Sequence, residues 1–223
     1  MLASSQLTFE LALPSHFDFN HFVVGNNQEA LSMLSSLDSD EPFMALWGHH
    51  GSGKTHLLKA WIHQAILNKE SALYIDACHT KLIDAAKHAK FLAIDHIEAL
   101  DANAQIILFS LYNLFRSTKE SRVLLASTLP PIHVNLRDDL RSRILSGLVY
   151  EIHGLSDEQK LTALHTYVRA QQINIHKNVL QYLLRHFQRN LTSLIAIVDT
   201  LDREALAQKH PITLPFLKTT LSI

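Results

Sequence analysis

A glycine-rich segment, residues 48–55 (GHHGSGKT), restricts the folds open to this chain of 223 residues more than any other feature. The apolar run 43–47 precedes it directly, and residues 56–67 follow with apolar side chains at helical spacing. A strand, a glycine-rich loop and a helix in this order form a phosphate-binding loop, where backbone amides and the helix N-terminus face a phosphate. The pattern therefore predicts a site for a nucleoside triphosphate or diphosphate; the alternative is a glycine-rich turn without a ligand.

Two further residues extend this predicted site to a metal. In phosphate loops of this type the lysine, here Lys54, contacts the β- and γ-phosphates, and the following hydroxyl, here Thr55, binds Mg²⁺. Asp95 ends an apolar run and suits a second magnesium-orienting carboxylate, although a strand-end cap is the alternative. The remaining residues predicted to bind the nucleotide through the loop are Gly48, Gly51, Ser52, Gly53 and His56.

The region around the loop alternates between short apolar runs and amphipathic stretches. Strands are predicted at residues 43–47, 72–76, 91–95, 122–127 and 149–152, and a long helix at 102–118. Continuous apolar runs are typical of strands that are buried on both faces. The pattern predicts an α/β fold in which helices cover a parallel sheet.

The pattern becomes purely helical after residue 155. Ser156 and Gln159 form a capping box that predicts a helix start. Helices are expected at 160–171, 177–187 and 191–208, and a short last element should end at residue 221. We therefore predict a tail (1–15), a nucleotide-binding α/β domain (16–154) and a small all-α lid domain (155–223).

Composition limits the partners of the chain. The formal net charge is −1, so specific binding of duplex DNA by the chain itself is not expected. No apolar run reaches the roughly 20 residues that span a bilayer, and residues 1–10 lack a secretion leader, so we expect a cytoplasmic protein. The single cysteine, Cys78, is expected to be a small buried hydrophobe. The 15 histidines show no spacing typical of a metal site and predict a pH-sensitive surface instead.

With these features in place, the chain resembles the AAA+ ATPases and, among them, the bacterial DnaA family, most closely its short Hda-type regulatory branch. Residues 17–26 resemble the family segment that folds over the adenine, which implies nucleotide contacts by Phe22, Val23 and Val24. Residues 139–143 resemble its arginine-finger box, and residues 199–205 and 214–218 resemble the end of its lid. We expect no helix-turn-helix domain after the lid, an expectation that favours the regulatory branch over the initiator.

The resemblance implies a catalytic role for Arg143. Presented across a subunit interface, this arginine would stimulate ATP hydrolysis by the replication initiator DnaA and so inhibit initiation. The alternative is a structural ion pair between Arg143 and Asp138 or Asp139. An arginine finger acts only across an interface, so a homo-oligomer is expected as well.

The N-terminal tail suggests a second partner. Gln6, Leu7, Phe9 and Leu11 resemble the peptide by which proteins dock on the DNA polymerase III sliding clamp (its β subunit). An amide suits a polar subsite, and Leu7 and Phe9 suit an apolar groove. The alternative is an N-terminal strand that packs on the chain itself.

Two departures from the family pattern predict weak or absent hydrolysis by this chain. His96 stands where an ATPase needs a carboxylate to orient water, and Glu98 should point elsewhere if the strand continues. Thr192 occupies the position of the γ-phosphate-sensing arginine, with Arg189 as a nearby substitute. A stand-alone ATPase of helicase-loader or clamp-loader type, and a small-molecule kinase, remain alternatives to the regulator.

Overall fold

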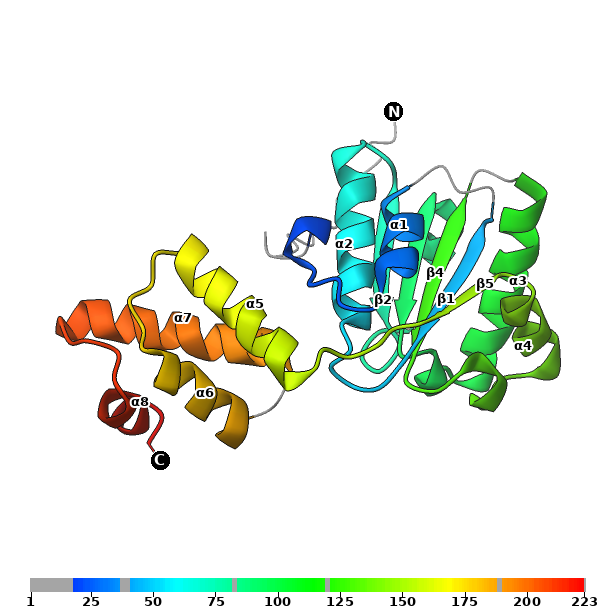
Figure 1. The fold of residues 1–223 in the computed structure, drawn as a ribbon. Coiled ribbons are helices and arrows are strands. Elements are labelled where there is room, and N and C mark those ends of the chain that lie inside the picture. Colours follow the sequence, from blue (N-terminus) through cyan, green and yellow to red (C-terminus); the bar gives the residue numbers. More distant parts are fainter. Residues whose placement is uncertain (1–17, 37–40, 82–83, 119–120, 188–189, 223) are drawn as a thin grey trace.

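The computed structural model describes residues 18–36, 41–81, 84–118, 121–187 and 190–222 (Figure 1). A sheet with helices on both sides is joined to a separate group of helices. The last strand ends at Glu151 and the first helix of the second group begins at Asp157, on either side of the predicted boundary. The predicted tail lies outside the described residues.

Five parallel strands form one sheet with the order β2-β3-β4-β1-β5. They are β1 (Phe43–Trp47), β2 (Ala72–Asp76), β3 (Phe91–Asp95), β4 (Arg122–Ser127) and β5 (Leu148–Glu151). The strand before the glycine-rich segment is therefore an inner strand, with Ala45 paired to Leu125 on one side and Val149 on the other. The four longer strands have the bounds that the sequence predicts. The fifth strand begins and ends one residue earlier than predicted. The predicted α/β fold class is confirmed.

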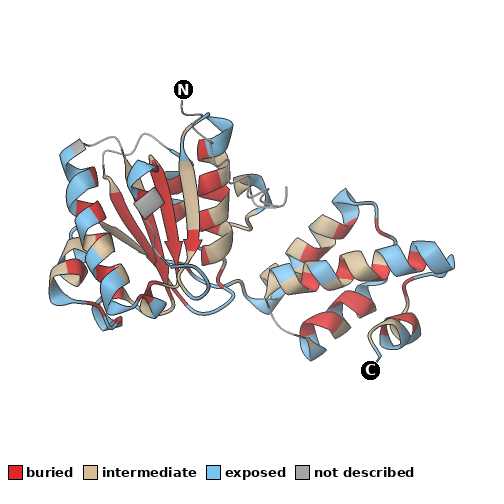
Figure 2. Ribbon diagram, turned by 180° about the vertical axis from the view of Figure 1, so that it is seen from behind, coloured by how far each residue is buried: buried red, intermediate tan, exposed pale blue. Residues whose placement is uncertain are grey.

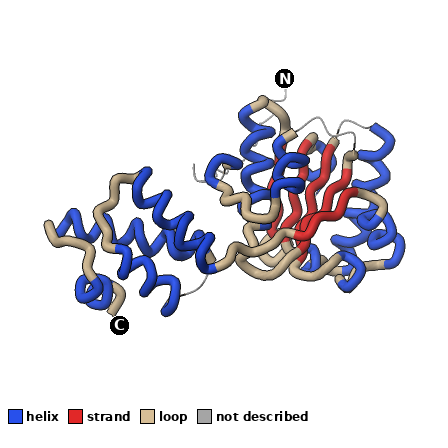
Figure 3. The backbone as a smooth tube through the Cα atoms, in the orientation of Figure 1, coloured by secondary structure: helices blue, strands red, loops and turns tan. Residues whose placement is uncertain are grey.

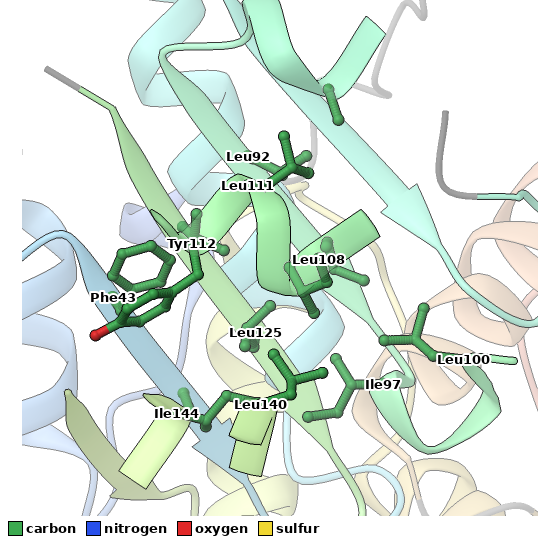
Figure 4. Close-up of a cluster of buried hydrophobic side chains, with 14 of the residues drawn as sticks. Phe43, Leu92, Ile97, Leu100, Leu108, Leu111, Tyr112, Leu125, Leu140 and Ile144 are labelled. Atoms are coloured by element: carbon green, nitrogen blue, oxygen red, sulfur yellow. The ribbon is translucent and has the colours of Figure 1, made fainter. Parts of the chain in front are cut away.

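Helices cover both faces of this sheet (Figure 3). They are α1 (Gln28–Ser35), α2 (Lys54–Leu67), α3 (Ala102–Thr118) and α4 (Asp138–Leu145), with short 3₁₀ turns η1 (Phe19–His21), η2 (Asp84–His88), η3 (Ile97–Ala99) and η4 (Pro131–His133). Successive strand side chains point to opposite faces, so Leu46 packs with α1 and α2 whereas Ala45 packs with α3 and α4. Figure 4 shows part of the core between the sheet and helices α3 and α4, where Phe43 stacks on Tyr112 at a ring separation of 3.9 Å.

The second group comprises four helices with a core of their own (Figure 2). They are α5 (Asp157–Ala170), α6 (Lys177–His186), α7 (Leu191–Gln208) and α8 (Leu214–Thr220). The predicted capping box is present: Ser156 accepts a hydrogen bond from the Gln159 amide, and the Gln159 side chain accepts one from the Ser156 amide. The predicted all-α part is therefore confirmed.

One expectation about the interior was wrong. Cys78 is exposed because β2 ends at Asp76 and the chain then turns along the surface. The Thr80 amide donates to the Asp76 carbonyl at 2.8 Å, which closes this turn. Among the described residues, none of the helices has the length and apolar content needed to span a membrane.

Candidate functional site

The glycine-rich segment leaves the carboxyl end of β1 and enters α2, as the sequence predicts. Two glycines are required by its path. A Cβ atom at Gly48 would stand 2.3 Å from the Ile152 carbonyl oxygen, and Gly53 has a φ of 103°, a conformation that side chains disfavour. The backbone can therefore curl tightly at both ends of the loop, which is the shape that directs successive amides toward a phosphate.

Lys54 begins α2 and lies almost entirely inside the loop. Its ammonium group donates hydrogen bonds to the carbonyls of Gly48 at 2.6 Å and His49 at 3.0 Å. Burial lowers the pKa of Lys54, while the negative charges of Asp95 and Glu98 oppose that shift. A desolvated cation that is held by neutral carbonyls is suited to an anionic ligand.

Thr55 and Asp95, the two residues predicted to bind magnesium, meet across the sheet edge. The Thr55 hydroxyl donates to the Asp95 carboxylate at 2.6 Å. Tyr74 of β2 donates to the same carboxylate oxygen at 3.2 Å, and burial together with the charge of Asp95 raises the pKa of Tyr74. The sequence analysis did not find Tyr74, because only the register of β2 beside β3 places it near Asp95.

The segment 18–24 lies over the start of α2. His56 and the Asp18 carbonyl are 2.8 Å apart, and the Phe22 ring comes within 2.8 Å of a Cβ built at Gly53. Phe22 and His56 are thus brought to the loop, and their contact with a nucleotide stays a prediction. Val23 and Val24 follow half-buried, and their contact with an adenine stays a prediction.

The expectation for Glu98 depended on a continuing strand, and the strand does not continue. β3 ends at Asp95, and η3 turns Glu98 toward the end of β4. There one oxygen of Glu98 accepts from the Thr128 amide at 3.0 Å and its hydroxyl at 2.7 Å. The other oxygen is buried and has no partner among the described residues. A carboxylate therefore lies near Lys54 even though position 96 is histidine.

The helical group approaches the loop through the start of α7. A Cβ atom built at Gly51 would lie 3.2 Å from the Cβ atom of Asn190. The Asn190 side chain caps α7 by accepting a hydrogen bond from the Ser193 amide. Thr192 is exposed in the first turn. Arg189 lies outside the described residues. Asn190 is thus a lid residue beside the loop that the sequence analysis missed.

Arg143 lies in the last turn of α4, away from the loop of its own chain. Its guanidinium is 5.6 Å from the centre of the Tyr112 ring, and Tyr112 stacks on Phe43 at the start of β1. The loop follows the other end of that strand, about 13 Å further along. Both suggested carboxylate partners are occupied by other arginines, Asp138 by Arg141 and Asp139 by Arg137. Within the described residues Arg143 forms no ion pair.

The fold and this loop define the class of protein: an α/β P-loop module followed by a helical lid, the AAA+ architecture. Residues 157–221 match the family model described as the Hda lid domain. The chain therefore has a DnaA-like AAA+ fold, and its helical part is similar to the Hda lid domain.

Solved structures with the same fold include replication initiators. Domain III of the replication initiation protein DnaA from Thermotoga maritima is 20% identical, with 94% of this chain and 97% of that chain covered and a TM-score of 0.78. AMPPCP-bound DnaA from Aquifex aeolicus is 22% identical, with 88% and 69% covered and a TM-score of 0.70. Protein NMB1076 from Neisseria meningitidis is 35% identical over 69% of this chain and 99% of that chain. Its TM-score is 0.47.

Proposed function

We propose that this protein is a regulator of chromosomal replication initiation that binds an adenine nucleotide and stimulates ATP hydrolysis by DnaA. The Hda-type lid and the DnaA-like fold support this class of function. The nucleotide would lie on the loop between Gly48 and Thr55, with its adenine under the segment that contains Phe22. DnaA from Aquifex aeolicus has been solved with AMPPCP, a nucleotide analogue, which supports ATP or ADP as the ligand here.

Magnesium fits the residues present beside the loop. The Thr55 hydroxyl and the Asp95 carboxylate converge within 2.6 Å, and both offer the oxygen ligands that Mg²⁺ prefers. Bound there with the nucleotide, the ion would neutralise phosphate charge. Lys54 would hold the phosphates after exchanging its two carbonyl partners for phosphate oxygens, and the Tyr74 hydroxyl would keep the Asp95 carboxylate oriented.

The position of Arg143 is the observation that carries the proposed action on DnaA. It projects from the face of the sheet opposite α2, and neither Asp138 nor Asp139 engages it. An arginine that is held by an aromatic ring and not by an acid keeps its charge available for a partner. Offered to the γ-phosphate of an ATP bound to DnaA, it would stabilise the charge that develops during hydrolysis. We also propose that the chain self-associates, with the surface around Arg143 at the subunit interface.

Docking on the sliding clamp is proposed from the sequence pattern alone, because Gln6, Leu7, Phe9 and Leu11 lie outside the described residues. Attachment to a DNA-loaded clamp would make stimulation depend on the presence of a clamp on DNA. The double variant Gln6→Ala and Phe9→Ala should lose a clamp pull-down. An undiminished pull-down would leave the tail without this role.

The decisive experiment measures ATP turnover by DnaA with and without this protein, in the presence of DNA-loaded clamp. Stimulation should require both this protein and the DNA-loaded clamp. Arg143→Ala should abolish the stimulation, since an arginine finger contributes about 10³–10⁵ in rate. Arg137→Ala is the matched control: it removes an exposed arginine before the same helix, and its pair with Asp139 contributes little to stability. Full stimulation by Arg143→Ala, or equal loss in the control, would refute the role of Arg143.

A second candidate, a stand-alone ATPase, is favoured by one observation. Glu98 is a part-buried carboxylate with a free oxygen and acts electrostatically on Lys54. In the regulator it holds the end of β4 through Thr128; in an ATPase it would orient the attacking water. ATP turnover by this chain alone, lost in Glu98→Gln, would favour the ATPase. The absence of such turnover would favour the regulator.

A further inference from the structure

The carboxyl ends of β2 and β3 bring together three side chains that the nucleotide site does not use. Asp76 is the last residue of β2 and pairs with Asp95, so it lies next to His96, which follows β3. Cys78 lies two residues beyond Asp76 in the turn that follows the strand. One ligand atom from each of the three residues, an oxygen, a sulfur and a nitrogen, lies within 4.8 Å of the other two.

The backbone already holds these groups in place. The amides of Cys78 and Thr80 donate to Asp76, at 3.0 Å to its carboxylate and 2.8 Å to its carbonyl. The Ala77 amide donates to the Asp95 carbonyl at 3.1 Å, which ties this turn to β3. His96 has a left-handed backbone with φ 56° and ψ 50°, and this turns its ring toward Asp76 and away from the strand direction. Little rearrangement is therefore needed to bind a ligand there.

Asp76 is the centre of the cluster. Its carboxylate lies 3.0 Å from Nδ1 of the His96 ring, and the Cys78 sulfur lies within 4.8 Å of both side chains. A metal ion would take the place of the hydrogen between Asp76 and His96 and draw the sulfur closer. Adjacent ligands of a tetrahedral zinc stand about 3.2–3.6 Å apart, so the oxygen and the nitrogen are already close to a suitable separation.

We propose that Asp76, Cys78 and His96 bind one Zn²⁺ ion or a similar borderline divalent cation. A thiolate and an imidazole favour such a metal over Mg²⁺, which prefers oxygen ligands. On binding, the thiol releases its proton to solvent and the sulfur bonds to the metal. Cys78 lines an open pocket of about 330 Å³, which gives a water molecule access as fourth ligand.

This site is separate from the one proposed for magnesium, although the two are adjacent. The Asp95 carboxylate accepts from the His96 amide at 3.0 Å through one oxygen and from Thr55 through the other. It lies 3.8 Å from the His96 ring nitrogen. The histidine at position 96, which makes a poor water-orienting residue, thus acquires a role of its own.

The test titrates the metal-free full chain with Co²⁺ and then with Zn²⁺, in competition with a chromophoric chelator. One Co²⁺ per chain should bind with a near-ultraviolet band from thiolate-to-metal charge transfer, and Zn²⁺ should displace it. Cys78→Ser should abolish that band and weaken Zn²⁺ binding by at least about tenfold. His96→Asn should also weaken binding by at least about tenfold, and it should fold because asparagine tolerates a left-handed backbone.

His79→Asn is the matched control, because it removes an exposed histidine that adjoins Cys78 and leaves the three ligands intact. Its Zn²⁺ affinity should match that of the parent chain. Co²⁺ binding without a thiolate band, or Zn²⁺ affinity that is unchanged in both Cys78→Ser and His96→Asn, would overturn the proposal. Either result would assign metal uptake to the many other histidines and leave Asp76 and His96 as a hydrogen-bonded pair.

Discussion

Replacing Gly48 by alanine adds a single methyl group at the point where the phosphate loop leaves the sheet. The new Cβ would stand 2.3 Å from the Ile152 carbonyl oxygen, a backbone atom that cannot rotate away. Ile152 is itself fixed, because its amide donates to the Trp47 carbonyl at 2.7 Å. Either the loop or the segment after β5 must therefore shift by about 1 Å to restore an ordinary contact, which is the scale of the overpacking that destabilises protein cores.

The expected cost has two parts. Overpacking of a well-packed region costs about 1–3 kcal/mol, and an alanine at the Gly48 φ of 155° adds about 1–3 kcal/mol of backbone strain. We expect Gly48→Ala to lower the free energy of unfolding by roughly 2–6 kcal/mol. At about 2–4 °C per kcal/mol for a chain of this size, the melting temperature should fall by at least about 4 °C.

Urea unfolding followed by tryptophan fluorescence suits this measurement. The chain has two tryptophans, Trp47 in β1 and Trp61 in α2, so the signal reports on the α/β unit. Two glycines serve as comparisons. A Cβ at Gly147 would stand 2.4 Å from the Phe43 carbonyl oxygen, at the end of β1 remote from the loop, whereas a Cβ at Gly154 would meet nothing within 4 Å.

The three substitutions separate stability from binding. Gly147→Ala should lower the stability and leave the ADP affinity of the folded protein intact. Gly154→Ala should change neither the stability nor the ADP affinity. Gly48→Ala should lower both the stability and the ADP affinity. Equal stability of Gly48→Ala and Gly154→Ala would refute the steric argument. Unchanged ADP affinity in folded Gly48→Ala would refute the assignment of this loop to the phosphates.

Three other predictions concern single contacts. Thr55→Val should weaken Mg²⁺-dependent ADP binding by about tenfold or more, because it removes a hydroxyl that contacts Asp95 at 2.6 Å; calorimetry with and without Mg²⁺ checks this. Burial lowers the pKa of His56 in the folded state, so its contribution to stability is fully present above the unfolded value near 6.5 and declines as the pH falls through the lower folded value. His56→Gln should therefore flatten the loss of stability between about pH 7.5 and 5.5, and an unaltered slope would assign that loss to other groups. Tyr167 donates to Asp199 at 2.6 Å between α5 and α7, with its pKa raised to about 12 by burial and this carboxylate. Tyr167→Phe should cost the lid about 1–2 kcal/mol in urea unfolding followed by circular dichroism, and a cost near zero would mean that water replaces the contact.

Local patterns were sufficient to predict most of the architecture. The strands of an inner parallel sheet are buried on both faces, so their apolar runs stand out from the residues around them. The glycine-rich segment, with a strand before it and a helix after it, predicted the loop and the placement of Lys54 and Thr55. The capping box at Ser156 predicted the start of the helical group. Each of these signals depends on residues that are neighbours in the chain.

The same patterns failed where distant segments meet. Cys78 was expected in the interior because cysteine is usually buried, but the turn after β2 exposes it. Glu98 was expected to point away from the site on the condition that β3 continued, and the 3₁₀ turn after Asp95 reversed its direction. Asn190 beside Gly51 and Tyr74 beside Asp95 could not be found from the sequence, because each pair depends on how two segments pack.

The sequence by itself thus determined the P-loop module, its parallel sheet and the helical lid, because short-range hydrophobic periodicity, glycine spacing and helix capping act within a few residues. Only the tertiary structure decided which charged groups find partners. Arg137 and Arg141 engage Asp139 and Asp138, whereas Arg143 engages neither. The register of β2 against β3 likewise brings Asp76, Cys78 and His96 together. Such pairings follow from strand order and helix packing, which bring together residues that are separated along the chain.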